Sequence, residues 1–176
     1  PPGVVNIVTG YGESAGAALV EHPGIDKIAF TGSTAVGRLI GAKALAGMKG
    51  VSLVLGGKGP VIVAADADVD TAVRGSAAAI YTNAGQACVA GSRLYVHERI
   101  FHEVVQGIAE RASALKIGAG FDATTQLGPL VSKEQLDRVL SYVELGQREG
   151  GKVVSGGRRH GADCGWGIRL LLRYRW

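Results

Sequence analysis

The chain has 176 residues, of which 47% are hydrophobic, and a formal net charge of +4. Its length suits one medium domain or parts of two, and no apolar run approaches the roughly 18 to 20 residues that cross a membrane. Three of the four excess positive charges come from Arg169, Arg173 and Arg175 in an acid-free C-terminal segment. Both signs are mixed elsewhere, so we expect neither a membrane nor a nucleic-acid partner.

Short β-branched segments alternate with longer segments of helical periodicity along the chain. The predicted strands cover residues 4–8, 27–30, 51–55, 61–63, 93–97 and 152–155, and the predicted helices cover residues 13–20, 34–49, 69–83, 100–115 and 133–149. Ser132 precedes the last helix and Gln135 follows three residues later, which is typical of a capping box. This alternation predicts an α/β fold with parallel sheets covered by helices.

Two glycine-bearing turns are candidate phosphate sites. Residues 30–37 follow a predicted strand and open a predicted helix, so free backbone N–H groups and the Ser33 hydroxyl face whatever lies at the helix N-terminus. Gly12 and Gly16 belong to a second such turn, after the first predicted strand. Each turn is weak evidence by itself, because helix capping and close packing also explain it.

Cys88 lies in a loop of small residues, 84–93, between a predicted helix and a predicted strand. A structural cysteine is more often found in an apolar run, whereas small neighbours leave room for a substrate to reach the sulfur. Both the structural and the nucleophilic role stay open at this point. Cys164 lies in a different context, so we expect neither a disulfide framework nor a zinc site, and a reducing, cytoplasmic setting follows.

Metal-binding spacings are not found. Asp66, Asp68 and Asp70 alternate like the start of a calcium loop, but its sixth position is Thr71 and its twelfth is Ala77, so we reject that interpretation. Asp68 is better explained as a helix cap. We expect no metal site.

Six segments resemble motifs of the aldehyde dehydrogenase superfamily, in sequence and in order. They are Pro2-Gly3-Val4-Val5-Asn6, Val8-Thr9-Gly10, Phe30-Thr31-Gly32-Ser33-Thr34, Leu55-Gly56-Gly57-Lys58, Gly85-Gln86-Ala87-Cys88 and Leu127-Gly128-Pro129-Leu130. The resemblance implies part of a Rossmann-like cofactor domain over residues 1–53, joined to part of an α/β parallel-sheet catalytic domain over 54–163. It also implies a small-molecule aldehyde substrate oxidised to a carboxylic acid, NAD or NADP as cofactor, and a homo-oligomeric full-length protein.

The same resemblance implies roles for particular residues. Cys88 would attack the aldehyde, and the thiohemiacetal would pass hydride to the nicotinamide and leave a thioester for hydrolysis. The backbone N–H of Cys88 would supply half of the oxyanion site. The residues expected along the cofactor are Gly12, Gly16, Phe30, Gly32, Ser33, Thr34, Val36, Gly37, Leu55 and Gly56.

The chain departs from the family pattern at the general base. The family has a glutamate immediately before Leu-Gly-Gly-Lys, and here that position is Val54. Valine cannot take a proton, and losing a general base costs about 10²–10⁴-fold in rate. Val54 does suit a buried strand, so we expect the fold to be kept while the activity of this chain is low.

Both ends of the chain depart as well. The sequence starts at Pro1, without the upstream asparagine of the oxyanion site and the residues that bind adenosine, so a parallel sheet would expose an unpaired apolar edge. Residues 164–176 form an aberrant tail that replaces the family's next strand, with the appearance of a frameshift or chimeric end. We interpret the chain as an internal fragment. Two alternatives stay open: a dehydrogenase that acylates coenzyme A, and a non-catalytic protein that retains the fold.

Overall fold

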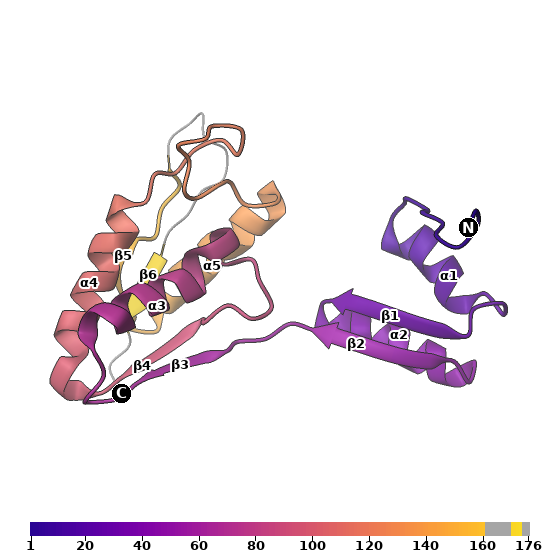
Figure 1. Ribbon diagram of the computed structural model, residues 1–176, viewed down its shortest axis with the longest axis horizontal. Helices are drawn as coiled ribbons and strands as arrows, with labels where there is room; N and C mark the ends of the chain where they lie inside the picture. Colours follow the sequence, from indigo (N-terminus) through magenta and orange to yellow (C-terminus); the bar gives the residue numbers. More distant parts are fainter. Residues whose placement is uncertain (161–169, 174–176) are drawn as a thin grey trace. The chain divides into compact units, whose positions relative to one another are not determined.

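The computed structural model describes residues 1–160 and 170–173. The chain forms two compact units, Pro1–Gly56 and Gly57–Trp176 (Figure 1). Each unit combines helices with a pair of parallel strands, which confirms the α/β prediction. The assignment of residues 1–53 to the cofactor and 54–163 to catalysis stays a prediction.

The first unit is a small β-α-β arrangement preceded by a short helical segment. Its elements are η1 (Gly12–Gly16), α1 (Ala17–Glu21), β1 (Lys27–Gly32), α2 (Thr34–Ala46) and β2 (Gly50–Leu55). β1 and β2 pair in parallel, with Thr31 opposite Val54. A Cβ atom at Gly37 of α2 would clash with Leu55 of β2, so glycine at this position lets the helix lie close to the sheet.

The predicted strand over residues 4–8 is wrong. Val4, Val5, Ile7 and Val8 lie in extended or bent backbone outside any strand, and each is at least 67% exposed. A strand forms only through ladder hydrogen bonds to a neighbouring strand, and no part of the described chain pairs with this segment. Its β-branched composition indicates a propensity for strand, but the described residues include no strand that pairs with it.

Val54 is 53% exposed, so the expectation of a buried side chain is wrong. Side chains of a strand alternate between the two faces of a sheet. Leu53 and Leu55 of β2 lie on the face that α2 covers, where they approach Gly41 and Gly37. Val54 points to the opposite face, which α2 does not cover.

A buried lysine connects the pieces of the first unit. Lys49 is 8% exposed, and its Nζ donates to the carbonyl oxygens of Val20 at 2.6 Å and His22 at 2.7 Å. These carbonyls lie at the C-terminal end of α1, where acceptors lack intrahelical partners and a cation is favoured. Lys43 of α2 also pairs with Glu21 of α1. The two lysines thus hold α1 against the rest of the unit.

The second unit contains most of the buried apolar residues. Its elements are β3 (Pro60–Val63), α3 (Val69–Tyr81), η2 (Thr82–Gly85), β4 (Arg93–Val96), η3 (Glu98–Ile100), α4 (Phe101–Ala114), α5 (Lys133–Arg148), β5 (Lys152–Gly156) and β6 (Leu170–Arg173). β3 and β4 are parallel, and β5 and β6 are antiparallel. Val63, Val73, Val104 and Ile108 form its main core between β3, α3 and α4. Outside β6, the predicted tail 164–176 lies beyond the described residues.

The predicted helix caps are confirmed. Asp68 Oδ1 accepts from the Thr71 N–H at 2.8 Å at the start of α3, and Ser132 Oγ accepts from the Gln135 N–H at 3.2 Å at the start of α5. The hydrogen bond from Thr71 lowers the pKa of Asp68 below its usual value. These caps satisfy backbone donors that the first helical turn leaves unpaired.

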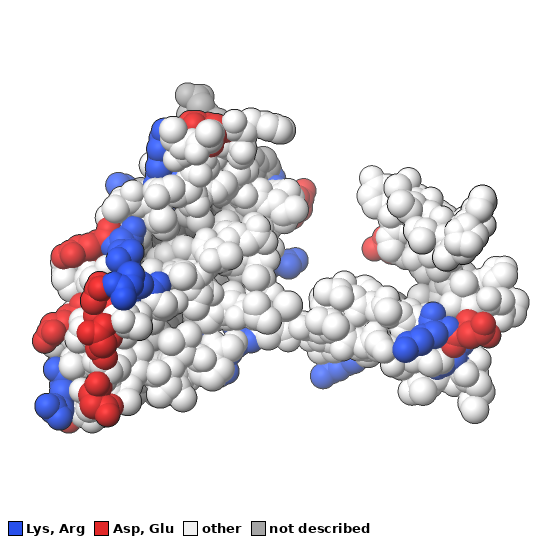
Figure 2. Space-filling view, viewed as in Figure 1, with Lys and Arg blue, Asp and Glu red and all other residues white. Residues whose placement is uncertain are grey.

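The charged residues of the second unit gather over α4 in one view, with both signs mixed (Figure 2). No helix within residues 1–160 and 170–173 is long and apolar enough to cross a membrane. The expected lack of a nucleic-acid partner stays a prediction.

Candidate functional site

Cys88 is exposed in the loop between η2 and β4, and the backbone around it is held in place. The Gly91 N–H donates to Ala79 O of α3 at 2.9 Å, and the Ala90 N–H donates to Ala87 O at 3.1 Å. Ala90 itself is buried. The loop therefore presents the thiol to solvent from a backbone that is fixed on its C-terminal side.

The segment that opens the second unit lies against the Cys88 backbone. A Cβ atom at Gly57 would lie 2.5 Å from Cys88 O, closer than real Cβ atoms approach an oxygen. Arg93 adds two bonds to the same segment, from its Nε to Lys58 O at 2.9 Å and from its N–H to Gly59 O at 3.3 Å. Glycine at position 57 is thus required for this approach, a role that the sequence motif did not reveal.

A left-handed turn precedes Cys88. Asn83, Ala84 and Gly85 have φ values of 54°, 55° and 74°. This conformation costs an L-residue such as alanine roughly 1–2 kcal/mol, and asparagine tolerates it better. Ala84 packs against the cluster of Leu130 and Leu136, and this burial offsets part of its strain.

Gln86 links this turn to a distant segment. Its backbone oxygen accepts from Asn83 Nδ2 at 3.3 Å, and its side-chain Oε1 accepts from the Val131 N–H at 3.0 Å. A cavity of about 110 Å³ lies between the turn and the segment beyond it, lined by Asn83, Ala84, Gln86, Gln126, Leu127, Gly128 and Pro129. Gln86 belongs to one of the sequence motifs, but its position there did not indicate this contact.

The N-terminus of α2 is open to solvent. Ser33 Oγ accepts from the Val36 N–H at 3.3 Å, and Ser33 O accepts from the Gly37 N–H at 2.9 Å. Thr34 and Ala35 are exposed, and their N–H groups have no acceptor among the described residues. α2 has 13 residues, so its first turn favours an anion.

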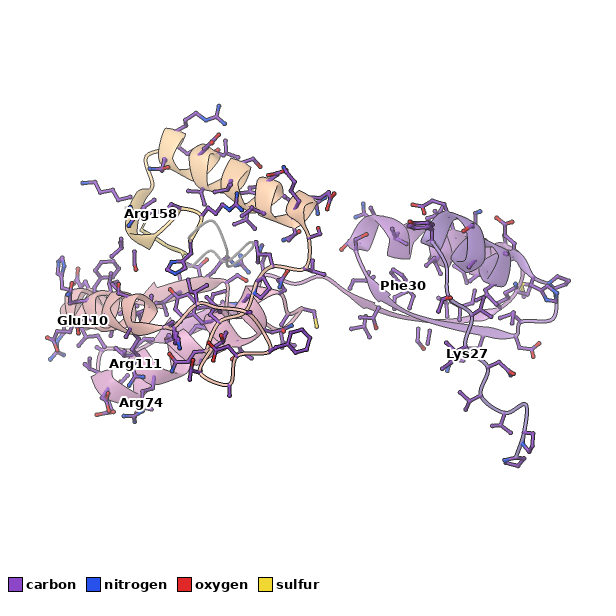
Figure 3. The ribbon with its side chains drawn as sticks, turned by 90° about the horizontal axis from the view of Figure 1, so that it is seen from above. Lys27, Phe30, Arg74, Glu110, Arg111 and Arg158 are labelled. Atoms are coloured by element: carbon purple, nitrogen blue, oxygen red, sulfur yellow. The ribbon has the colours of Figure 1, made fainter. Side chains whose placement is uncertain are left out.

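Several cofactor candidates have packing roles in the first unit. A Cβ at Gly32 would clash with the ring of Phe30, which lies on the half-buried face of β1 (Figure 3), and Gly37 packs against Leu55. Gly56 is exposed with open space around it. Gly12 and Gly16 belong to η1, a separate turn that leads into α1.

Of these candidates, Gly37 in the segment 30–37 and Leu55 of β2 thus lie against each other. These candidates and Val54 belong to the first unit, whereas Cys88 belongs to the second. Their shared role in one site stays a prediction.

A larger groove, of about 900 Å³, lies elsewhere in the second unit, between α3 and α4. Asp70, Glu103, Glu110 and Arg111 are among its lining residues, and Figure 3 labels Glu110 and Arg111 on α4. Cys88 does not line this groove, and the acidic residues around it form no cluster of metal ligands within the described chain. We assign it no function.

Comparisons with known proteins cover nearly the whole chain. Residues 1–170 match the model of the aldehyde dehydrogenase family. Phenylacetaldehyde dehydrogenase of Pseudomonas fluorescens is 48% identical over 168 residues, which are 96% of this chain and 33% of that protein. Retinal dehydrogenase 2 of Mus musculus is 50% identical over 159 residues, 90% of this chain and 31% of that protein.

The structural comparison agrees. An aldehyde dehydrogenase of Bacillus cereus, solved as an NAD+ complex, superimposes with a TM-score of 0.90 at 44% identity, over 93% of this chain and 33% of that one. The chain spans about a third of the length of the curated relatives it matches. From its sequence and its fold, the chain belongs to the aldehyde dehydrogenase family.

Proposed function

We propose that this chain carries the nucleophile and part of the cofactor site of an enzyme that oxidises an aldehyde to a carboxylic acid with NAD+ or NADP+. The observation that carries the proposal is the exposed thiol of Cys88 on a loop whose backbone is held by hydrogen bonds. Family membership supports the reaction, and the NAD+ complex of the Bacillus cereus relative supports the cofactor.

Cys88 forms the first bond in the proposed reaction. Its thiolate Sγ adds to the aldehyde carbon, and the carbonyl oxygen becomes an oxyanion. The Cys88 N–H, which has no acceptor in the described part of the chain, donates to that oxygen. When bound, NAD(P)+ supplies the hydride acceptor that turns the thiohemiacetal into a thioester. Water then cleaves the S–C bond, which releases the acid and restores the thiol.

The first turn of α2 fits a phosphate group of that cofactor. The exposed N–H groups of Thr34 and Ala35 need acceptors, and a helix N-terminus stabilises negative charge. We therefore place a cofactor phosphate beside Ser33 and Thr34. The other residues proposed along the cofactor are Gly12, Gly16, Phe30, Gly32, Val36, Gly37, Leu55 and Gly56.

Val54 limits turnover in this chain, because it has no group that activates water for thioester hydrolysis. We expect no aldehyde-dependent NADH formation at 340 nm, since the missing base alone costs about 10²–10⁴-fold. Val54 also favours a second function, in which the thiol of coenzyme A attacks the thioester and Cys88 leaves as thiolate. Turnover restored by coenzyme A, but not by Val54→Glu, would assign that function.

The decisive experiment tests whether an aldehyde adds to the thiol of Cys88. The chain is alkylated with iodoacetamide at increasing phenylacetaldehyde concentration, with NAD+ present, and labelled cysteines are identified by mass spectrometry. We expect saturable protection of Cys88, because the thiohemiacetal removes the free thiol. Cys164 is the internal control, since unspecific addition protects both cysteines alike. Equal protection of the two cysteines would refute the proposal.

A further inference from the structure

We propose that Gln86 is a positioning residue, which fixes the backbone of Cys88 by connecting its loop to the segment 116–131. The inference rests on the proposed function, because it concerns the same thiol. Gln86 does not react in this scheme. It acts through the hydrogen bond from the Val131 N–H to its Oε1, at 3.0 Å between residues 45 positions apart.

The Val131 end of this bond is firmly held. The Lys116 N–H donates to Gln126 Oε1 at 2.9 Å, and the Leu127 N–H donates to Lys116 O at 3.1 Å, so the segment folds back on itself. Leu130, immediately before Val131, is buried, and Ser132, immediately after it, caps α5. Val131 as a whole is 82% exposed, so the residue contributes its backbone N–H rather than packing.

The Cys88 end of the bond follows a strained turn. Three consecutive left-handed residues, Asn83 to Gly85, precede Gln86, and alanine at position 84 is strained in that conformation. The cavity of about 110 Å³ separates this turn from residues 126–129. Beyond this cavity Ala84 packs against Leu130 and Leu136, and the hydrogen bond of Gln86 is a second, polar link between the two segments. One residue, Ala87, lies between Gln86 and Cys88. A displacement of Gln86 would therefore also displace the backbone N–H of Cys88.

This arrangement predicts different effects on two reactions of the same thiol. With p-nitrophenyl acetate, Cys88 Sγ bonds to the ester carbon, an oxyanion forms, and p-nitrophenolate leaves. With iodoacetamide, Sγ bonds to the methylene carbon, iodide leaves, and no oxyanion forms. The ratio of the acylation rate to the alkylation rate therefore reports the position of the Cys88 N–H, whereas exposure of the thiol changes both rates together.

The experiment uses the full chain with Cys164→Ala, so that Cys88 is the reacting thiol. Gln86→Met keeps the length of the side chain but removes the acceptor. Gln106→Met is the matched control, because Gln106 bonds to Glu110 on the exposed side of α4. We expect Gln86→Met to lower the ratio about tenfold, since misplacing an oxyanion donor is costly. We expect Gln106→Met to change the ratio less than about twofold, because its contact lies away from the loop.

Amide hydrogen exchange of Val131 gives a second readout. We expect faster exchange in Gln86→Met and retained protection in Gln86→Glu, which keeps an acceptor. If Gln86→Met does not fold, loss of Val131 protection in Gln86→Glu overturns the inference.

The outcomes separate the inference from the proposed function. An unchanged ratio in Gln86→Met overturns the inference and leaves the function standing. A ratio in the Cys164→Ala chain no higher than that of N-acetylcysteine amide overturns both.

Discussion

Two helix glycines of the second unit have different surroundings, so the same substitution is expected to act in opposite directions. A Cβ atom added at Gly75 of α3 would have no neighbouring atom within 4 Å, whereas one added at Gly107 of α4 would lie 2.8 Å and 3.1 Å from the two methyl carbons of Val73. Alanine is favoured over glycine inside a helix by about 0.8–1.0 kcal/mol. Gly75→Ala should therefore raise the free energy of unfolding by roughly that amount.

Gly107→Ala gains the same helix propensity but overpacks the contact between α3 and α4. Overpacking of this kind costs about 1–3 kcal/mol, so the two variants should differ by about that amount. The measurement is urea unfolding followed by far-UV circular dichroism, with equal m-values as the condition for comparing midpoints. Val73→Ala removes the two methyl groups but also truncates a core residue, so the double variant Gly107→Ala/Val73→Ala should lose less free energy of unfolding than the sum of the two single variants. Equal midpoints for Gly75→Ala and Gly107→Ala would contradict this packing of α3 against α4.

Two further predictions concern backbone conformation and pH. Met48 has φ 53° after α2, where the Lys49 N–H donates to Ala44 O at 2.9 Å. Met48→Gly should therefore raise the free energy of unfolding by up to about 1 kcal/mol, which would be measured as a higher urea midpoint. The Thr71 hydrogen bond lowers the pKa of Asp68, so its stabilising effect is present above the usual aspartate pKa of about 3.9 and is lost as the pH falls through the lowered value. As the pH is lowered, the free energy of unfolding should therefore fall more steeply in the parent chain than in Asp68→Asn. Parallel curves of this free energy against pH would contradict the cap.

Local features of this protein could be predicted from its sequence. The caps at Asp68 and Ser132 form as expected, because each bond joins residues three positions apart. The helices were predicted to within a few residues, since their hydrogen bonds and apolar periodicity are also local. The ordered motifs were sufficient to indicate the family, which the comparisons confirm.

Only the tertiary structure decided which segments meet. Residues 4–8 have the composition of a strand but no described partner, and Val54 is exposed because α2 covers the other face of β2. The approach of Gly57 to the Cys88 carbonyl and the bond from Val131 to Gln86 join residues more than thirty positions apart. Strand pairing and loop contacts depend on groups that are distant in sequence, so propensity and spacing along the chain do not specify them.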